Sequence, residues 1–132
     1  MRTPDDCLHL TVEQVLEIHR VMLEEFGGAP GVRDEGLLES AIAAPQATVF
    51  GQSPFQDVVE VAAAYLFYLC RNHAFFDGNK RTAMATAIVF LRVNRLEPAP
   101  DGDEWEALVL DVAASRLDRE ATAKRLRTLV KS

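Results

Sequence analysis

The residues of this sequence that could do chemistry lie together between His73 and Arg81. Nine consecutive positions hold a histidine, an aspartate, a glycine, an asparagine and two bases, in the order His73-Ala74-Phe75-Phe76-Asp77-Gly78-Asn79-Lys80-Arg81. Histidine titrates near neutral pH, so His73 could accept a proton from a hydroxyl group. Asp77 could hold a Mg²⁺ ion that bridges phosphate oxygens, because hard cations prefer oxygen ligands. The stretch therefore predicts a site for phosphate chemistry.

The residues after Gly78 predict a phosphate cradle at the start of a helix. Asn79, Lys80 and Arg81 fall in its first turn, where unpaired backbone N–H groups and the helix dipole favour anions. Cations at that end are unfavourable for the helix itself, so the two bases favour a binding role. Gly78 permits the tight turn that precedes them.

Each of these residues also has a purely structural explanation. His73 could cap the C-terminus of one helix, Asp77 or Asn79 could cap the next, and the bases could be solvated. For any one residue alone we favour that explanation. The presence of all of them within nine positions favours function.

Two apolar helices are expected on either side of this loop. The first is predicted from the capping signature Ser53-Pro54-Phe55-Gln56 to about Asn72, and the second from Lys80 to Asn94. The longest uninterrupted apolar run, Val61 to Cys70, has ten residues. That is too short to span a bilayer and is typical of a buried core helix.

Shorter helices complete the predicted fold. Each begins at a capping signal: Thr11, Asp34, the acidic run 101–104 and Asp118. The stretch from Pro45 to Gln52 is expected to be partly extended without forming a sheet. We therefore predict an all-α fold of about six helices, forming a single domain over residues 1–132.

Composition and charge narrow the class of protein. The chain has 132 residues, 26% of them charged, and a net charge of −6, which is ordinary for a globular domain and argues against direct nucleic-acid binding. Residues 71–95 nevertheless carry five basic side chains against Asp77 alone, a local charge of +4. One bound anionic ligand is compatible with that stretch. The sequence shows neither a secretory signal nor a membrane-spanning segment, so a cytoplasmic location is expected.

Several other reactive residues are assigned no functional role. Cys7 and Cys70 are expected to fill the core. His9 is expected at the surface and His19 on a helix face. The basic residues from Arg116 onward are expected to form a solvated helix face, with a partner-binding surface as the alternative.

The motif from His73 to Arg81 resembles the signature of the Fic/Doc superfamily, His-x-Phe-x-Asp/Glu-Gly-Asn-Gly/Lys-Arg, at every fixed position. The upstream stretch 31–41, GVRDEGLLESA, resembles the Doc branch, the toxins of Phd/Doc-type toxin–antitoxin pairs. The resemblance is close from about Thr11 to Leu96. It implies an all-α fold with the motif between two central helices.

Two departures from the AMP-transferring Fic pattern indicate the branch. Those enzymes have glycine where Lys80 stands, and a second arginine where Met84 stands. The resemblance to Doc implies that ATP binds in the reverse sense and presents its γ-phosphate. The implied function is that of a toxin: an ATP-dependent kinase that phosphorylates a protein hydroxyl, with translation elongation factor Tu as the family's known target, and so inhibits translation.

The resemblance also assigns roles to individual residues. His73 would be the general base, Asp77 the Mg²⁺ ligand, and Gly78, Asn79, Lys80 and Arg81 the phosphate-binding group. Phe75 would anchor the loop in the core. The segment from Pro45 to Gln52 would be the flap that docks the target.

Regulation is expected to come from another chain. The inhibitory Ser/Thr-x-x-x-Glu-Gly/Asn helix of many Fic proteins is not found in the sequence. The resemblance implies a Phd-like antitoxin whose disordered tail folds into a groove on this domain. Two alternatives are AMP transfer by an atypical Fic protein and a catalytically silent partner that acts through an antitoxin as a transcriptional co-regulator.

Overall fold

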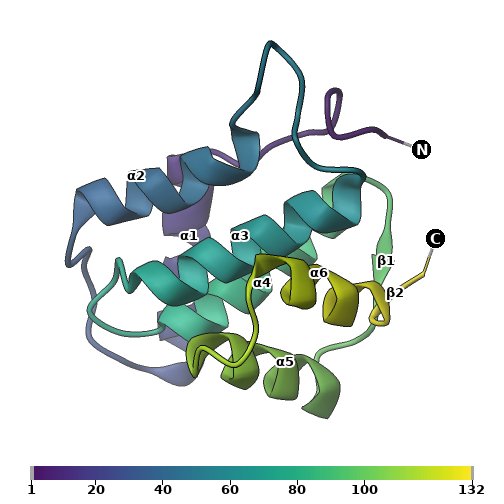
Figure 1. The fold of residues 1–132 in the computed structure, drawn as a ribbon. Coiled ribbons are helices and arrows are strands. Elements are labelled where there is room, and N and C mark those ends of the chain that lie inside the picture. Colours follow the sequence, from purple (N-terminus) through teal and green to yellow (C-terminus); the bar gives the residue numbers. More distant parts are fainter. Residues whose placement is uncertain (1, 132) are drawn as a thin grey trace.

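The computed structural model of the protein describes residues 2–131, which form six α-helices and little else (Figure 1). The helices are α1 (Val12–Phe26), α2 (Glu35–Ala43), α3 (Val58–Asn72), α4 (Asn79–Val93), α5 (Asp103–Ala113) and α6 (Arg119–Arg127). A single 3₁₀ turn, η1 (Ala44–Gln46), follows α2. The predicted all-α fold is confirmed. None of these helices combines the length and apolar character needed to cross a membrane.

Helices α3 and α4 form the centre of the fold, as their apolar sequences predict. Ten of the fifteen residues of α3 are buried, and α3 packs against α2, α4, α5 and α6. In Figure 1 it runs through the middle of the molecule, with α2 on one side and α5 and α6 on the other. Tyr65 of α3, Phe90 of α4 and Trp105 of α5 are among the largest fully buried side chains. The loop between α3 and α4 is therefore fixed at both ends by the core.

Most helix starts agree with the capping signals. Thr11 forms a complete capping box with Gln14 at the start of α1. Asp34 caps α2 and Asp118 caps α6, each by accepting a hydrogen bond from a backbone N–H. These side chains satisfy donors that a helix leaves unpaired at its first turn.

The predicted start of α3 is wrong by several residues. The helix begins at Val58, where the Asp57 carboxylate accepts a hydrogen bond from Glu60 N at 3.0 Å. Ser53 instead accepts from Phe55 N at 3.2 Å, within a turn that precedes the helix. Both positions carry capping residues, and the tertiary structure selects the second.

Two short extended features were not predicted as strands. The strands β1 (Glu97–Pro98) and β2 (Val130–Lys131) pair antiparallel and tie the segment after α4 to the C-terminal end. Val49 and Gln52 form an isolated bridge in the segment expected to be partly extended. The turn between them has Phe50 at φ 51° and Gly51 at φ 79°, the signs of a type I′ hairpin turn.

Candidate active site

All six predicted site residues line one pocket of about 610 Å³. His73, Asp77, Gly78, Asn79, Lys80 and Arg81 come from the α3–α4 loop and the start of α4. The end of α1 and the glycines after it form another wall of the pocket, through Phe26, Gly27 and Gly28. The structure thus brings the predicted residues together, and their individual roles stay predictions.

His73 ends α3 and presents an exposed imidazole. It is the C-cap residue, with φ 50° and ψ 49° in the left-handed region, a conformation uncommon for residues other than glycine. Its backbone oxygen accepts a hydrogen bond from Arg33 Nε at 2.8 Å, which satisfies one carbonyl at the helix end. Among residues 2–131 no hydrogen-bond partner is found for the imidazole itself. The ring is therefore available to a ligand that enters the pocket.

Backbone donors orient the Asp77 carboxylate. Oδ1 accepts from Gly78 N at 3.0 Å and Oδ2 accepts from Ala29 N at 3.3 Å. The side chain remains exposed at the pocket. Across the described part of the chain, no group of three or more His, Cys, Asp and Glu side chains could hold a metal ion. A single carboxylate nevertheless fits Mg²⁺, which commonly binds through one or two carboxylates together with substrate phosphates and water.

Asn79 closes the loop with its side chain. Its Nδ2 donates to Phe75 O at 2.9 Å, and its Oδ1 accepts from Phe75 N at 3.0 Å. Phe75 is 2% exposed and lies in the core, which confirms the expected anchor. Because its amide is already paired, Asn79 can offer a phosphate chiefly its backbone N–H.

The start of α4 carries no side-chain cap. Gly78 is the N-cap residue at φ 76°, and no side chain bonds to the first N–H groups of α4. Lys80 and Arg81 are exposed at this end, and the Arg81 guanidinium lies over the Phe26 ring at 3.7 Å from its centroid. An uncapped helix N-terminus flanked by two cations is well suited to bind phosphate.

The segment between α1 and α2 pairs with the active-site loop. Val32 forms an antiparallel bridge with Phe75, and Phe76 N donates to Gly31 O at 3.3 Å. Arg33 N donates to Ala74 O at 2.7 Å. The sequence predicts a loop here, and its hydrophobic pattern does not reveal the contact with the site. The glycines at 27, 28 and 31 were the available signal, since all three adopt positive φ.

The segment predicted as the flap, Pro45 to Gln52, does not lie beside the site. Pro45 to Gln52 precedes α3, whereas His73 ends it, and fifteen helical residues span roughly 22 Å. Figure 1 shows this loop projecting at the opposite end of α3 from the α3–α4 loop. Gly27 to Asp34 is the segment that lies beside the site, because its backbone bonds to Ala74 and Phe76.

His19 also contacts the loop, although its place in the sequence predicts only a position on a helix face. Its Nε2 lies 2.9 Å from Asp77 O, and its ring stacks on Phe75 with centroids 3.7 Å apart. Neither contact could be read from the sequence, because 58 positions separate His19 from Asp77. Helical periodicity placed His19 on a helix face but did not identify what that face meets.

The two cysteines and His9 lie outside the pocket's lining. Burial raises the pKa of the Cys70 thiol to about 11 and also raises the pKa of Cys7, so both stay protonated at neutral pH. His9 was expected at the surface and is half-buried. Its Nδ1 lies 2.9 Å from the Tyr65 hydroxyl, and partial burial lowers its pKa.

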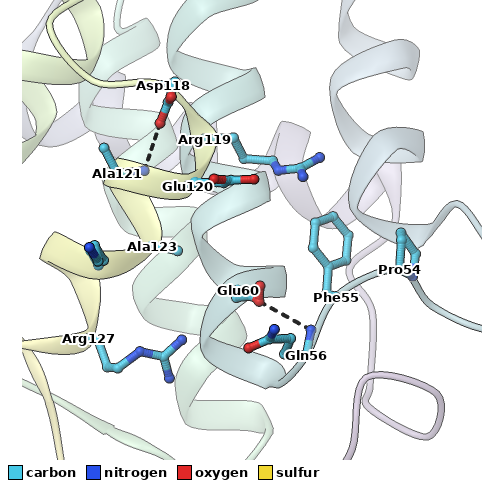
Figure 2. A pocket seen from close by; sticks show the side chains of 11 residues that line it. Pro54, Phe55, Gln56, Glu60, Asp118, Arg119, Glu120, Ala121, Ala123 and Arg127 are labelled. Carbon is cyan, nitrogen blue, oxygen red and sulfur yellow. Dashed lines mark hydrogen bonds between the residues drawn. The ribbon is translucent and has the colours of Figure 1, made fainter.

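A second hollow, of about 720 Å³, lies between α6 and the start of α3 (Figure 2). Several of its charged groups are already engaged. Arg127 pairs with Asp57, Glu60 accepts from Gln56 N at 3.2 Å, and Asp118 caps α6. The Arg119 guanidinium lies 5.0 Å from the centroid of the Phe55 ring. This hollow brings together no set of groups comparable to the one between α3 and α4.

Comparison with known proteins gives consistent matches. Residues 9–91 match the sequence profile of the Fic/DOC family. The chain is 47% identical over 103 residues to "Toxin Doc" of Mycolicibacterium smegmatis, covering 76% of this chain and 79% of that protein. It is 35% identical over 121 residues to "Protein kinase doc" of Escherichia phage P1, covering 92% and 94% of the two chains.

Proposed function

The chain belongs to the Fic/Doc family, in its Doc toxin branch, and from this premise we propose that it is an ATP-dependent protein kinase. It transfers the γ-phosphate of ATP to a hydroxyl group of a protein target. The name of the phage P1 relative, "Protein kinase doc", supports this reaction class. The pocket contains all six predicted site residues, and its two basic residues outnumber its one acidic residue. Both features are consistent with a kinase that binds ATP.

The position of Lys80 is the observation that carries the proposal. It stands in the first turn of α4, at the pocket and beside Arg81. The AMP-transferring relatives have glycine at this place, which leaves room for the α-phosphate. A lysine side chain fills that room, so the nucleotide is expected to present its γ-phosphate instead.

Each residue has a step in the proposed transfer. His73 accepts the proton of the target hydroxyl while the oxygen attacks the γ-phosphorus and the bond to the β–γ bridging oxygen breaks. ADP leaves with the charge that develops on that oxygen. Lys80, Arg81 and the free N–H groups of α4 hold the phosphates in line for the attack.

Asp77 is the residue that would hold Mg²⁺. Its carboxylate is exposed at the pocket and oriented by two backbone donors. A bound Mg²⁺ would neutralise phosphate charge. Asn79 acts through the loop, because its amide holds the backbone of Phe75.

The expected partners follow from the family. We propose elongation factor Tu as the target, with inhibition of translation as the consequence. We also propose that a Phd-like antitoxin restrains the protein. Two exposed apolar side chains support such a contact. Phe26 is 50% exposed and lines the pocket, and Leu110 is 53% exposed and lines a hollow of about 240 Å³ that shares Lys80 and Arg81 with the pocket.

The test compares two labels. The purified protein is incubated with a bacterial lysate and ATP that carries the label on either the α- or the γ-phosphate. We expect protein to gain the γ label only, and we expect His73→Ala to transfer neither. Label from the α-phosphate would refute the kinase and support AMP transfer. Absence of both labels, with the folded structure intact, would support the silent co-regulator.

A growth assay supplies an independent check. Expression of the wild-type chain is expected to stop growth of a bacterial host, and His73→Ala is expected to be tolerated. Equal inhibition by both chains would show that His73 is not required for toxicity.

A further inference from the structure

We infer that His19 is a positioning residue that holds the backbone of the phosphate-binding loop from the neighbouring helix α1. The inference rests on the proposed function, since it concerns the same pocket. His19 is not among the pocket's lining residues, so it acts through Asp77 and Gly78 and not on the nucleotide directly.

The contact is built as a specific hydrogen bond. His19 Nε2 lies 2.9 Å from Asp77 O. A carbonyl oxygen can only accept, so Nε2 must carry the hydrogen. The ring is 5% exposed, and a buried polar group without a partner is unfavourable. The bond therefore satisfies both His19 and the loop carbonyl.

The stacking on Phe75 fixes where this donor points. The two rings are nearly parallel, at 9°, with centroids 3.7 Å apart. Phe75 is itself anchored in the core and held by Asn79. The imidazole is thus confined between a core aromatic ring and the turn that carries Asp77. A phenyl ring at this position could keep the stacking but would supply no donor to the Asp77 carbonyl.

Gly78, the next residue of the loop, packs against two side chains of α1. Gly78 adopts φ 76°, and a Cβ atom there would lie 3.4 Å from Leu23 Cδ2 and 3.6 Å from His19 Nε2. Gly78 N in turn donates to Asp77 Oδ1. Movement of the Asp77 carbonyl would therefore shift both the proposed metal-binding carboxylate and the first N–H groups of α4.

One face of α1 supports the whole turn. His19, Leu23 and Phe26 follow at four and three residues, the spacing of one helix face. They meet in order the Asp77 carbonyl, Gly78 and the Arg81 guanidinium. Of the three, His19 makes the hydrogen bond to the loop backbone, so it is the one whose chemistry can be separated from packing.

Two variants separate the hydrogen bond from the ring. His19→Phe keeps an aromatic ring against Phe75 but lacks the donor. His19→Gln lacks the ring but can place an amide N–H near the position of Nε2. His9→Phe is the matched control, because His9 also bonds through a ring nitrogen but to Tyr65, outside the pocket.

Two measurements are made on each folded variant. Amide hydrogen exchange of the ATP-free protein reports the order of residues 76–82. Label transfer from γ-labelled ATP into lysate protein is followed as an initial rate over a range of ATP concentrations. These rates report the catalytic efficiency of the site. Melting temperatures are recorded so that transfer is compared well below each transition.

We expect the amides of residues 76–82 to exchange faster in His19→Phe than in the wild type. We also expect kcat/KM for ATP to fall by up to about 100-fold, which is the scale of a 1 Å misplacement. His19→Gln should recover at least part of both properties. His9→Phe should melt at a lower temperature with transfer and loop exchange unchanged.

The inference is overturned if His19→Phe matches the wild type in exchange and transfer, or if both His19 variants fail alike while loop exchange stays at the wild-type rate. If His19→Phe does not fold, His19→Gln alone decides: loop exchange and transfer near the wild-type values support the donor role, and loss of both refutes it. If the wild type transfers α label or none, the proposed kinase fails, whereas loop exchange still decides the role of His19.

Discussion

Replacing Asn79 with alanine should destabilise the protein and disorder the active-site loop. The substitution removes the hydrogen bonds at 2.9 and 3.0 Å between the Asn79 amide and the backbone of Phe75. At about 0.5–1.5 kcal/mol each, the two bonds together contribute about 1–3 kcal/mol to the free energy of unfolding. For a chain of 132 residues, this corresponds to a fall in melting temperature of roughly 4–11 °C.

The assay for Asn79→Ala combines thermal unfolding by circular dichroism with transfer from γ-labelled ATP, measured well below the transition. Asn94→Ala is the matched control at the other end of α4. Its side chain bonds to Leu8 O, Leu8 N and Phe90 O at 3.0, 2.7 and 2.9 Å. The control should lose at least as much stability as Asn79→Ala, yet it should retain the transfer activity.

Two results would refute the reasoning about Asn79. A melting temperature equal to that of the wild type would show that the amide does not hold the loop together. Unchanged stability with complete loss of transfer would instead assign the Asn79 side chain to the phosphate directly. That outcome would require the amide to leave Phe75 when ATP binds.

Three further predictions concern the rest of the chain. Gly28 has φ 124°, and Gly28→Ala places a Cβ atom 3.1 Å from the Asp77 carboxylate. We therefore expect urea unfolding to give a free energy of unfolding that is lower by about 1–3 kcal/mol. We also expect a higher KM for ATP than in the wild type. Burial lowers the pKa of His9 below its ordinary value of 6.5, so the fold favours the neutral ring. Stability should therefore be full above pH 6.5 and fall as the pH drops below it; a His9→Asn variant should show a flatter melting profile between pH 7 and 5. Phe50 is fully exposed, has φ 51° and precedes Gly51. Phe50→Asn therefore creates the Asn-Gly pair that type I′ turns prefer. We expect the free energy of unfolding to rise by about 1 kcal/mol and the melting temperature by a few degrees. An unchanged or lower melting temperature would show that this turn is not strained.

Local signals in the sequence predicted much of the fold. The caps at Thr11, Asp34 and Asp118 marked three helix starts correctly, because a capping side chain bonds to backbone within a few residues of itself. The apolar character of α3 identified the central helix. The six candidate site residues were found together because they are neighbours in the chain.

The features that could not be predicted from the sequence depend on contacts between residues that are distant in the chain. Ser53 and Asp57 are both capable caps, and the choice between them depends on packing around the start of α3. The strands β1 and β2 have two residues each, too few for periodicity to show. His19 and Arg33 contact the loop from 58 and 40 positions away. The misplaced flap has the same cause, since the pairing of Val32 with Phe75 leaves no local pattern.

The chemical group gained by the target protein tests the proposed kinase most directly. The labelled protein is isolated from a lysate treated with the wild-type chain and ATP, and its modified peptide is identified by mass spectrometry. We predict one added phosphoryl group on a side-chain hydroxyl, and no modification after treatment with His73→Ala. An added AMP group, or a phosphoryl group that His73→Ala transfers equally well, would contradict the proposed mechanism.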